Sequence, residues 1–110
     1  MITWDQVVAM ALRLPGCVLS TSYGRPAVKL RNKTFACTGK EHDHFVLMVE
    51  PEEAEALMAQ QPRMFFRTPH YAHSRAVLVR FRSADKELVE VLLQRGWSRH
   101  ATKAQRAALD

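Results

Sequence analysis

Residues 22–38 read SYGRPAVKLRNKTFACT, and apolar side chains recur in this segment at every second position. A period of two is typical of a β-strand that buries one of its faces. Asn32-Lys33 separates two such runs and predicts a tight turn, because asparagine tolerates a positive φ angle. We therefore expect a β-hairpin in this segment. Its inward side chains should be Val28, Leu30, Phe35 and Cys37, and its outward side chains Lys29, Arg31, Thr34 and Thr38.

The same period continues around the hairpin, from residue 18 to residue 50, and predicts an antiparallel meander. Beyond the hairpin, the ranges expected as strands are 44–49, after a loop at 39–43, then 64–67 and 76–82. In the last of these strands, Arg80 and Arg82 should share a face with Leu78, because alternate side chains of a strand point the same way.

Helices are predicted before and after the meander. Thr3 and Gln6 form a capping-box pattern at the start of the first helix, which Pro15-Gly16 ends. Pro51 suits the first position of a second helix. Proline has no backbone N–H, and an N–H at that position would have no partner within the helix. Gln61-Pro62 should end that helix.

A third helix is expected after the last strand. Ser83 is a plausible N-cap and Gly96 fits the C-terminal cap. The side chains expected to face inward from this helix are Leu88, Val91 and Leu92. Residues 98–110 are polar and alanine-rich, so they should form a marginal helix or a frayed tail.

This order of elements predicts an α+β fold in which helices pack on one face of an antiparallel sheet. The other face would be open to water and, from the phases of the strands, basic. The whole chain, 1–110, is expected to be one domain, because typical domains run to roughly 100–150 residues.

Charge is the main compositional feature, with a net charge of +5 and a pI near 9.7. No acidic residue lies between Ala56 and Ala84, whereas that segment carries Arg63, Arg67, Arg75, Arg80 and Arg82. Arginine suits bidentate contact with phosphate or carboxylate. A solvated surface without a ligand is the alternative interpretation.

Cysteine and hydropathy patterns exclude some classes of protein. Cys17 and Cys37 are too far apart for a zinc knuckle and too few for a disulfide scaffold, so both are expected to be reduced and at least half-buried. No apolar run approaches the roughly 18 residues that span a membrane. The chain begins on a helix signal without a charged-then-apolar leader, so we expect a cytoplasmic protein.

Several motifs in a fixed order carry a resemblance over residues 3–103. They are Thr3-Trp4-Asp5, Leu14-Pro15-Gly16, Ser22-Tyr23-Gly24-Arg25-Pro26-Ala27, Lys33-Thr34-Phe35-Ala36, Val49-Glu50-Pro51-Glu52-Glu53, Phe65-Phe66-Arg67-Thr68-Pro69-His70-Tyr71, Val77-Leu78-Val79-Arg80, Leu88, Leu92 and Trp97. As an ordered set, these motifs resemble the MmcQ/YjbR family of small bacterial proteins. The resemblance implies a fold similar to CyaY/frataxin, often described as a double-wing DNA-binding motif, with the hairpin at Asn32-Lys33 and the loop at 39–43 as wings.

Binding of nucleic acid, and of DNA in particular, is the first functional hypothesis. Phosphates require grouped cations, whereas nothing here indicates a recognition helix, so binding should be largely independent of base sequence. The expected phosphate contacts are Lys29, Arg31, Lys33, Arg80 and Arg82, followed by Arg67 and Arg75, with Tyr71 or His70 stacking on an exposed base.

A second hypothesis is a protein-interaction or adaptor domain whose arginines bind an acidic partner. An enzyme is not expected, because the chain has no serine-centred elbow, phosphate loop or paired carboxylates in an apolar segment.

The frataxin-like fold that the resemblance implies suggests iron binding. Frataxins use an acidic ridge on the first helix and the neighbouring strand, whereas here the first helix carries only Asp5 as an acidic residue and contains Arg13. His42 and His44 would share a face if both lay in a strand, and His70 and His73 form a second grouping. Loop histidines are more often solvated, so neither a metal nor a cofactor is expected.

Overall fold

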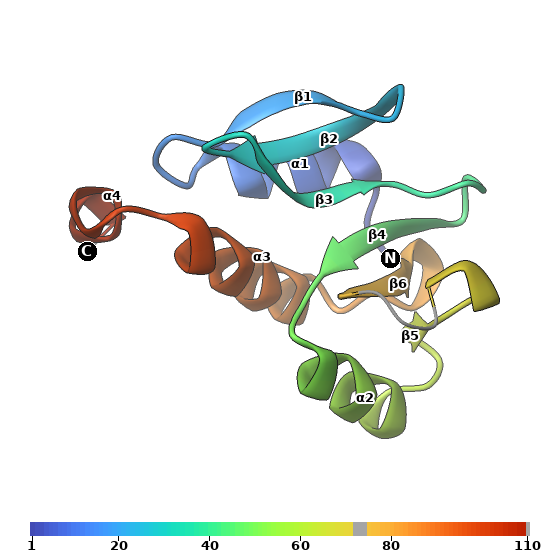
Figure 1. Ribbon diagram of the computed structural model, residues 1–110. Coiled ribbons are helices and arrows are strands. Elements are labelled where there is room, and N and C mark those ends of the chain that lie inside the picture. The colour runs from blue at the N-terminus through green and yellow to red at the C-terminus, as the bar shows by residue number, and fades with distance from the viewer. Residues whose placement is uncertain (72–74, 110) are drawn as a thin grey trace.

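The computed structural model of the protein describes residues 1–71 and 75–109 (Figure 1). Within these residues, six strands form one antiparallel sheet in the order β1-β2-β3-β4-β6-β5. Their bounds are Val18–Ser22 for β1, Arg25–Leu30 for β2, Lys33–Thr38 for β3, His44–Met48 for β4, Phe65–Phe66 for β5 and Ala76–Arg80 for β6.

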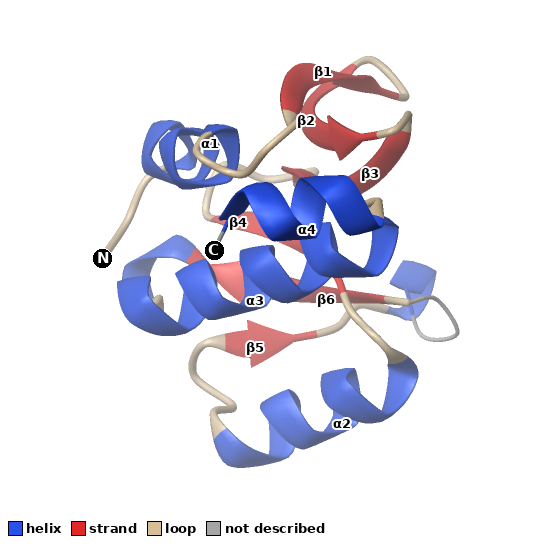
Figure 2. Cartoon of the chain, turned by 90° about the vertical axis from the view of Figure 1, so that its left-hand side faces the viewer, coloured by secondary structure: helices blue, strands red, loops and turns tan. Residues whose placement is uncertain are grey.

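The α-helices are α1 (Trp4–Leu12), α2 (Pro51–Gln60), α3 (Lys86–His100) and α4 (Lys103–Leu109), and two 3₁₀ turns are η1 (Pro69–Tyr71) and η2 (Phe81–Ser83). The helices α1 and α3 pack on one face of the sheet, and α2 lies beside its β5 edge (Figure 2). This arrangement confirms the predicted α+β class.

The main core lies between the sheet and these helices. Its largest buried side chains are Phe35, Phe45, Phe65 and Trp97, contributed by β3, β4, β5 and α3. The indole Nε1 of Trp97 donates a hydrogen bond of 2.7 Å to the carbonyl of Pro15, so the end of α3 is attached to the loop that follows α1.

The predicted capping box at the start of α1 is confirmed. The backbone amide of Gln6 donates to Thr3 Oγ1 at 3.2 Å, and the amide of Thr3 donates to Gln6 Oε1 at 2.9 Å. An unforeseen box of the same kind joins Thr102 and Gln105 at the start of α4, with distances of 3.1 and 2.9 Å. The tail is therefore a capped helix, and Arg106 ties it to α3 by donating 2.7 Å to the carbonyl of Ala101.

The predicted bounds of the third helix were wrong. The N-cap is Asp85, whose carboxylate accepts hydrogen bonds from the amides of Glu87 and Leu88, and the helix continues to His100. Gly96 lies inside the helix and faces Phe35, and an added Cβ would be 3.4 Å from the Cβ of Phe35. The buried side is formed by Val89, Leu92, Leu93, Gly96 and Trp97, whereas Val91 is 45% exposed.

A β-bulge changes which side chains of β3 face the core. The register between β2 and β3 shifts between Val28 and Lys29, so Phe35 and Ala36 are both buried on the helix side. One extra residue inverts the facing of every later side chain in the strand. The prediction for Cys37 was therefore wrong: it lies on the opposite face, beside Val46.

The turn of the hairpin also lies one residue earlier than predicted. Arg31 and Asn32 have φ angles of 51° and 65°, whereas Lys33 already belongs to β3. Two consecutive residues with positive φ form the two-residue turn that suits the twist of antiparallel strands. Arg31 is therefore at the tip of the hairpin rather than on a face of the sheet.

The last strand is shorter than expected. His44, the first residue of β4, pairs with Arg80, so β6 has no partner strand beyond this point. Phe81–Ser83 instead forms η2, and the amide of Phe81 donates to the carbonyl of Asp43 at 3.0 Å. The prediction that Arg82 shares a sheet face with Leu78 was therefore wrong.

Candidate nucleic-acid interface

The face of the sheet opposite α1 and α3, here called the outer face, has an apolar centre. Cys37, Val46, Leu78 and Phe66 follow one another across β3, β4, β6 and β5 in the strand register. None of the described α-helices packs on this face. The predicted basic face is thus apolar in the middle, with cations at its margins.

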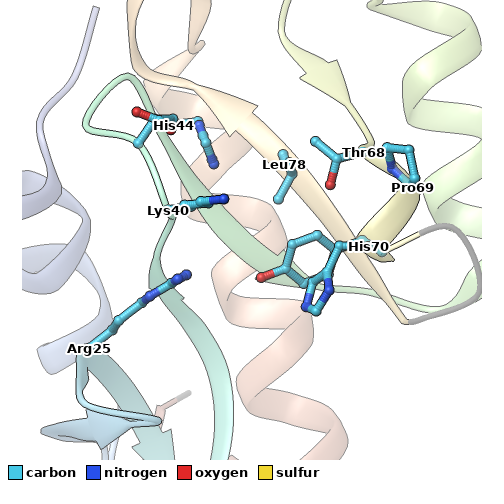
Figure 3. A pocket seen from close by; sticks show the side chains of 9 residues that line it. Arg25, Lys40, His44, Thr68, Pro69, His70 and Leu78 are labelled. Atoms are coloured by element: carbon cyan, nitrogen blue, oxygen red, sulfur yellow. The ribbon is translucent and has the colours of Figure 1, made fainter.

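A cavity of about 530 Å³ lies on the outer face, and we call it the outer-face cavity. Arg25 from the start of β2 and Lys40 from the β3–β4 loop extend into it from one side, and Thr68 and His70 border it on the other (Figure 3). The residues that line it are Arg25, Lys40, Glu41, His44, Thr68, Pro69, His70, Tyr71 and Leu78.

The aromatic side of the cavity is formed by η1. The amide of Tyr71 donates to the carbonyl of Thr68 at 2.9 Å, which closes this short turn. The rings of His70 and Tyr71 meet edge to face, with centroids 4.8 Å apart and planes at 90°. Tyr71 also contacts the apolar centre of the outer face, so its ring stands between that centre and solvent.

His44 forms a buried wall of the cavity. Its side chain is 8% exposed, and its Nδ1 lies 2.7 Å from Asp43 Oδ1. This hydrogen bond is the main cause that lowers the pKa of the Asp43 carboxyl. The ring of His44 also meets Phe66 edge to face at 5.3 Å, which fixes it at the bottom of the cavity.

Two of the predicted phosphate contacts, Arg80 and Arg67, are held by partners in the α2–β5–β6 region. The guanidinium of Arg80 lies 4.1 Å from the centre of the Phe66 ring and donates to the carbonyls of Pro62 and Arg63, each at 3.2 Å. Arg67 is 14% exposed and lies 3.2 Å from Glu55. These arginines hold the α2–β5–β6 region together.

The other predicted residues fall into separate groups. Lys29 lies on the outer face beside Thr34. Arg31, Lys33 and Arg75 lie at the other end of the strands, around cavities that Arg99 and His100 also line. Arg82 is near the N-terminus, in a cavity with Met1 and Trp4. The eight predicted residues therefore do not form one surface.

The possible metal ligands are also separated. His42 is in the loop before β4 and lines the cavity near the N-terminus, whereas His44 lines the outer-face cavity, so the two rings do not share a strand face. His73 lies outside the described residues. Among those described, no three histidine, cysteine or acidic side chains are grouped to hold a metal ion.

Both cysteines are free thiols and are half-buried. Burial raises the pKa of Cys17 to about 11 and also raises the pKa of Cys37 above its ordinary value. Both thiols are therefore protonated near neutral pH.

Sequence reasoning did not select Arg25, Lys40, Arg99 or His100. The sequence did contain a feature that points to Arg25. Tyr23-Gly24 is a pair typical of turns, so Arg25, the next residue, is expected to begin the second strand of a hairpin. The structure gives Tyr23 and Gly24 φ angles of 53° and 79°, and Tyr23 is fully exposed at the tip.

None of the described helices combines the length and the apolar character needed to cross a membrane. A comparison with curated proteins found no significant match. Among solved structures, the Deinococcus radiodurans protein DR2400, with its domain DUF419, is similar with a TM-score of 0.76 and 23% sequence identity. The match covers 99% of this chain and 88% of that chain, and at this identity it shows the fold.

A family model described as YjbR matches residues 12–99. This match agrees with the resemblance carried by the sequence motifs and spans most of the 110 residues. The chain therefore belongs to the YjbR family.

Proposed function

We propose that the protein binds nucleic acid through the outer-face cavity, by contacts to phosphates and to unpaired bases. The observation that carries this proposal is the placement of Arg25 and Lys40 across one cavity from His70 (Figure 3), whose ring Tyr71 meets edge to face. Cations bind the phosphate backbone, and aromatic rings stack on bases of any sequence.

The surroundings of the cavity favour a single strand over a duplex. A cavity of about 530 Å³ is within the range that admits a group the size of a base. A base can enter only when it is unpaired, because the flat faces of paired bases are stacked inside the duplex. Base-specific reading in a major groove is not part of the proposal, since α1 and α3 pack against the opposite face of the sheet.

The test is fluorescence anisotropy with labelled single-stranded and duplex DNA between about 50 and 300 mM salt. The variant Arg25→Gln/Lys40→Gln should bind single strands more weakly and make the log–log salt slope shallower by about 1.4, since each lost phosphate contact contributes about 0.7. Tyr71→Ala should weaken binding without changing the slope, because the tyrosine is uncharged.

The matched control is Lys86→Gln/Lys103→Gln, which also removes two positive charges. Both lysines are exposed at the first positions of α3 and α4, outside the outer-face cavity. An equal loss of affinity in the control would show that charge alone matters and would refute a site at the cavity. The absence of binding at about 50 mM salt would refute the proposal as a whole.

An adaptor domain is the second candidate, and the free edge of the sheet favours it. β1 is an edge strand on which Val18 and Leu19 are each about half exposed, with Tyr23 fully exposed beyond it. A partner strand can pair with such an edge. Capture of an acidic protein that survives nuclease treatment and is lost in a Leu19→Lys variant would support this function.

A further inference from the structure

A cluster of basic side chains lies where the β2–β3 turn approaches the end of α3, and we call it the turn-end cluster. It consists of Arg31, Lys33, Arg99 and His100. These four side chains, with Ala101, line a cavity of about 260 Å³. Lys33, Arg99 and His100 also line a neighbouring cavity of about 440 Å³, which extends to Glu50 and Arg75.

Two guanidinium groups of the cluster contact backbone carbonyls, Arg99 at a short distance and Arg31 at the outer limit of a hydrogen bond. Arg31 Nη1 donates to the carbonyl of His100 at 3.5 Å, and Arg99 Nη2 donates to the carbonyl of Met48 at 2.7 Å. The positive φ angle of Arg31 fixes the turn from which it projects. Groups that are fixed before a ligand arrives lose less entropy on binding.

The positive charge of the cluster exceeds the negative charge beside it. Glu50 is the one carboxylate among the described residues that line the two cavities, and it lies 3.5 Å from Arg99 and 3.9 Å from Arg75. The side-chain ammonium of Lys33 forms no hydrogen bond or ion pair with any residue that the structure describes. Together the two cavities are lined by four cations, Arg31, Lys33, Arg75 and Arg99, so an anion with two charges would offset most of the excess of three.

We propose that the turn-end cluster binds a doubly charged oxyanion of the phosphate monoester class, with Arg31, Lys33 and Arg99 as its cationic donors. Guanidinium and ammonium groups form their strongest hydrogen bonds with such oxygens. The phosphate can come from a small phosphorylated molecule or from the terminal phosphate of a nucleic acid. The site shares no residue with the outer-face cavity, so it does not depend on the proposed function.

His100 supplies a reporter inside the site. Partial burial and the charges of Arg99, Lys33 and Arg31 lower its pKa, whereas Glu50 acts in the opposite direction. A bound anion would offset the three cations and raise this pKa, so binding would be accompanied by uptake of a proton. Affinity should therefore increase as the pH falls. Sulfate is the suitable probe, because it keeps both charges across this pH range.

The experiment follows the ring signals of His100 by NMR while the full chain is titrated with sodium sulfate, with sodium chloride at equal ionic strength as the reference. We expect a saturable shift and a higher pKa of His100 with sulfate only. Lys33→Gln should weaken sulfate binding about tenfold, since one charge-assisted contact is lost. Arg31→Asn should do the same while keeping a residue that accepts the positive φ.

Lys86→Gln is the matched control, because it removes one charge at the first position of α3, outside both cavity regions, and should leave the sulfate-induced shift of His100 unchanged. A shift that never saturates, or that chloride reproduces, would overturn the proposal. Equal binding by Lys33→Gln would do so as well. Loss of DNA binding in Lys40→Gln with intact sulfate binding would separate the two sites.

Two further ligands distinguish the sources of the phosphate. A nucleoside 5′-monophosphate that moves the His100 signals as sulfate does would support a small phosphorylated molecule. A short oligonucleotide that moves them only when it carries a terminal phosphate would support a nucleic-acid end. An equal effect of the oligonucleotide without that phosphate would overturn the assignment to a monoester.

Discussion

At the scale of single residues, Arg80 and Arg82 have similar sequence surroundings and very different roles. Arg80 lies over Phe66 and donates to two backbone carbonyls, whereas Arg82 is exposed in η2. Position relative to the end of a strand, rather than residue type, therefore decides which of two neighbouring arginines is available to a ligand.

Replacement of Arg80 should reveal this difference as a change in stability. Arg80→Ala should lower the free energy of unfolding by about 2 kcal/mol, because a cation–π contact and charged hydrogen bonds are lost. Arg82→Ala, the control, should change it by less than about 0.5 kcal/mol. Urea unfolding with a common slope measures both, and equal effects of the two substitutions would contradict this role of Arg80.

At the scale of elements, α3 depends on a close approach to β3. Its buried side includes Gly96, which faces Phe35, and Trp97. An added Cβ would be in ordinary contact with Phe35, so a side chain that extends further is expected to press against that ring.

Substitution at Gly96 tests this packing. Gly96→Ala should stabilise the protein by up to about 1 kcal/mol, because alanine is the better helix former. Gly96→Leu should destabilise it by about 1–3 kcal/mol through overpacking against Phe35. Thermal unfolding measures both effects, and a destabilising alanine would show that the contact is tighter than described.

Local signals predicted more of the fold than of the site. The capping box of Thr3 and Gln6 and the alternation in β2 depend on nearby residues, and both are confirmed. The end of α3 and the bulge in β3 depend on contacts between distant segments, and both predictions were wrong. Arg99 and His100 were missed for this reason. The predicted helix ended at Gly96, so both residues fell in the segment expected to be a marginal helix or a frayed tail.

At the scale of the whole molecule, charge at the turn-end cluster should make stability depend on pH. The folded chain lowers the pKa of His100 below its ordinary value of 6.5, because the ring is partly buried beside Arg99, Lys33 and Arg31. The unfolded chain therefore takes up this proton at a higher pH. The contribution of His100 to stability is present above about pH 6.5 and is lost as the pH falls toward the pKa of the folded state.

A comparison of pH profiles tests this contribution. The free energy of unfolding of the wild type should fall more between about pH 7.5 and 5.5 than that of His100→Gln, which has no group to titrate there. Parallel profiles for the wild type and His100→Gln would contradict the lowered pKa.

The bulge in β3 reverses which alternate positions of that strand face the helices and which face outward. Up to Phe35, the odd and even positions of β3 face opposite sides of the sheet. From Ala36 onward, the sides that odd and even positions face are exchanged. A relative that lacks the extra residue and keeps the same turn would present the position of Ala36 where Cys37 lies here. Functional residues can therefore be transferred between members of the family across this strand only after the bulge itself has been aligned.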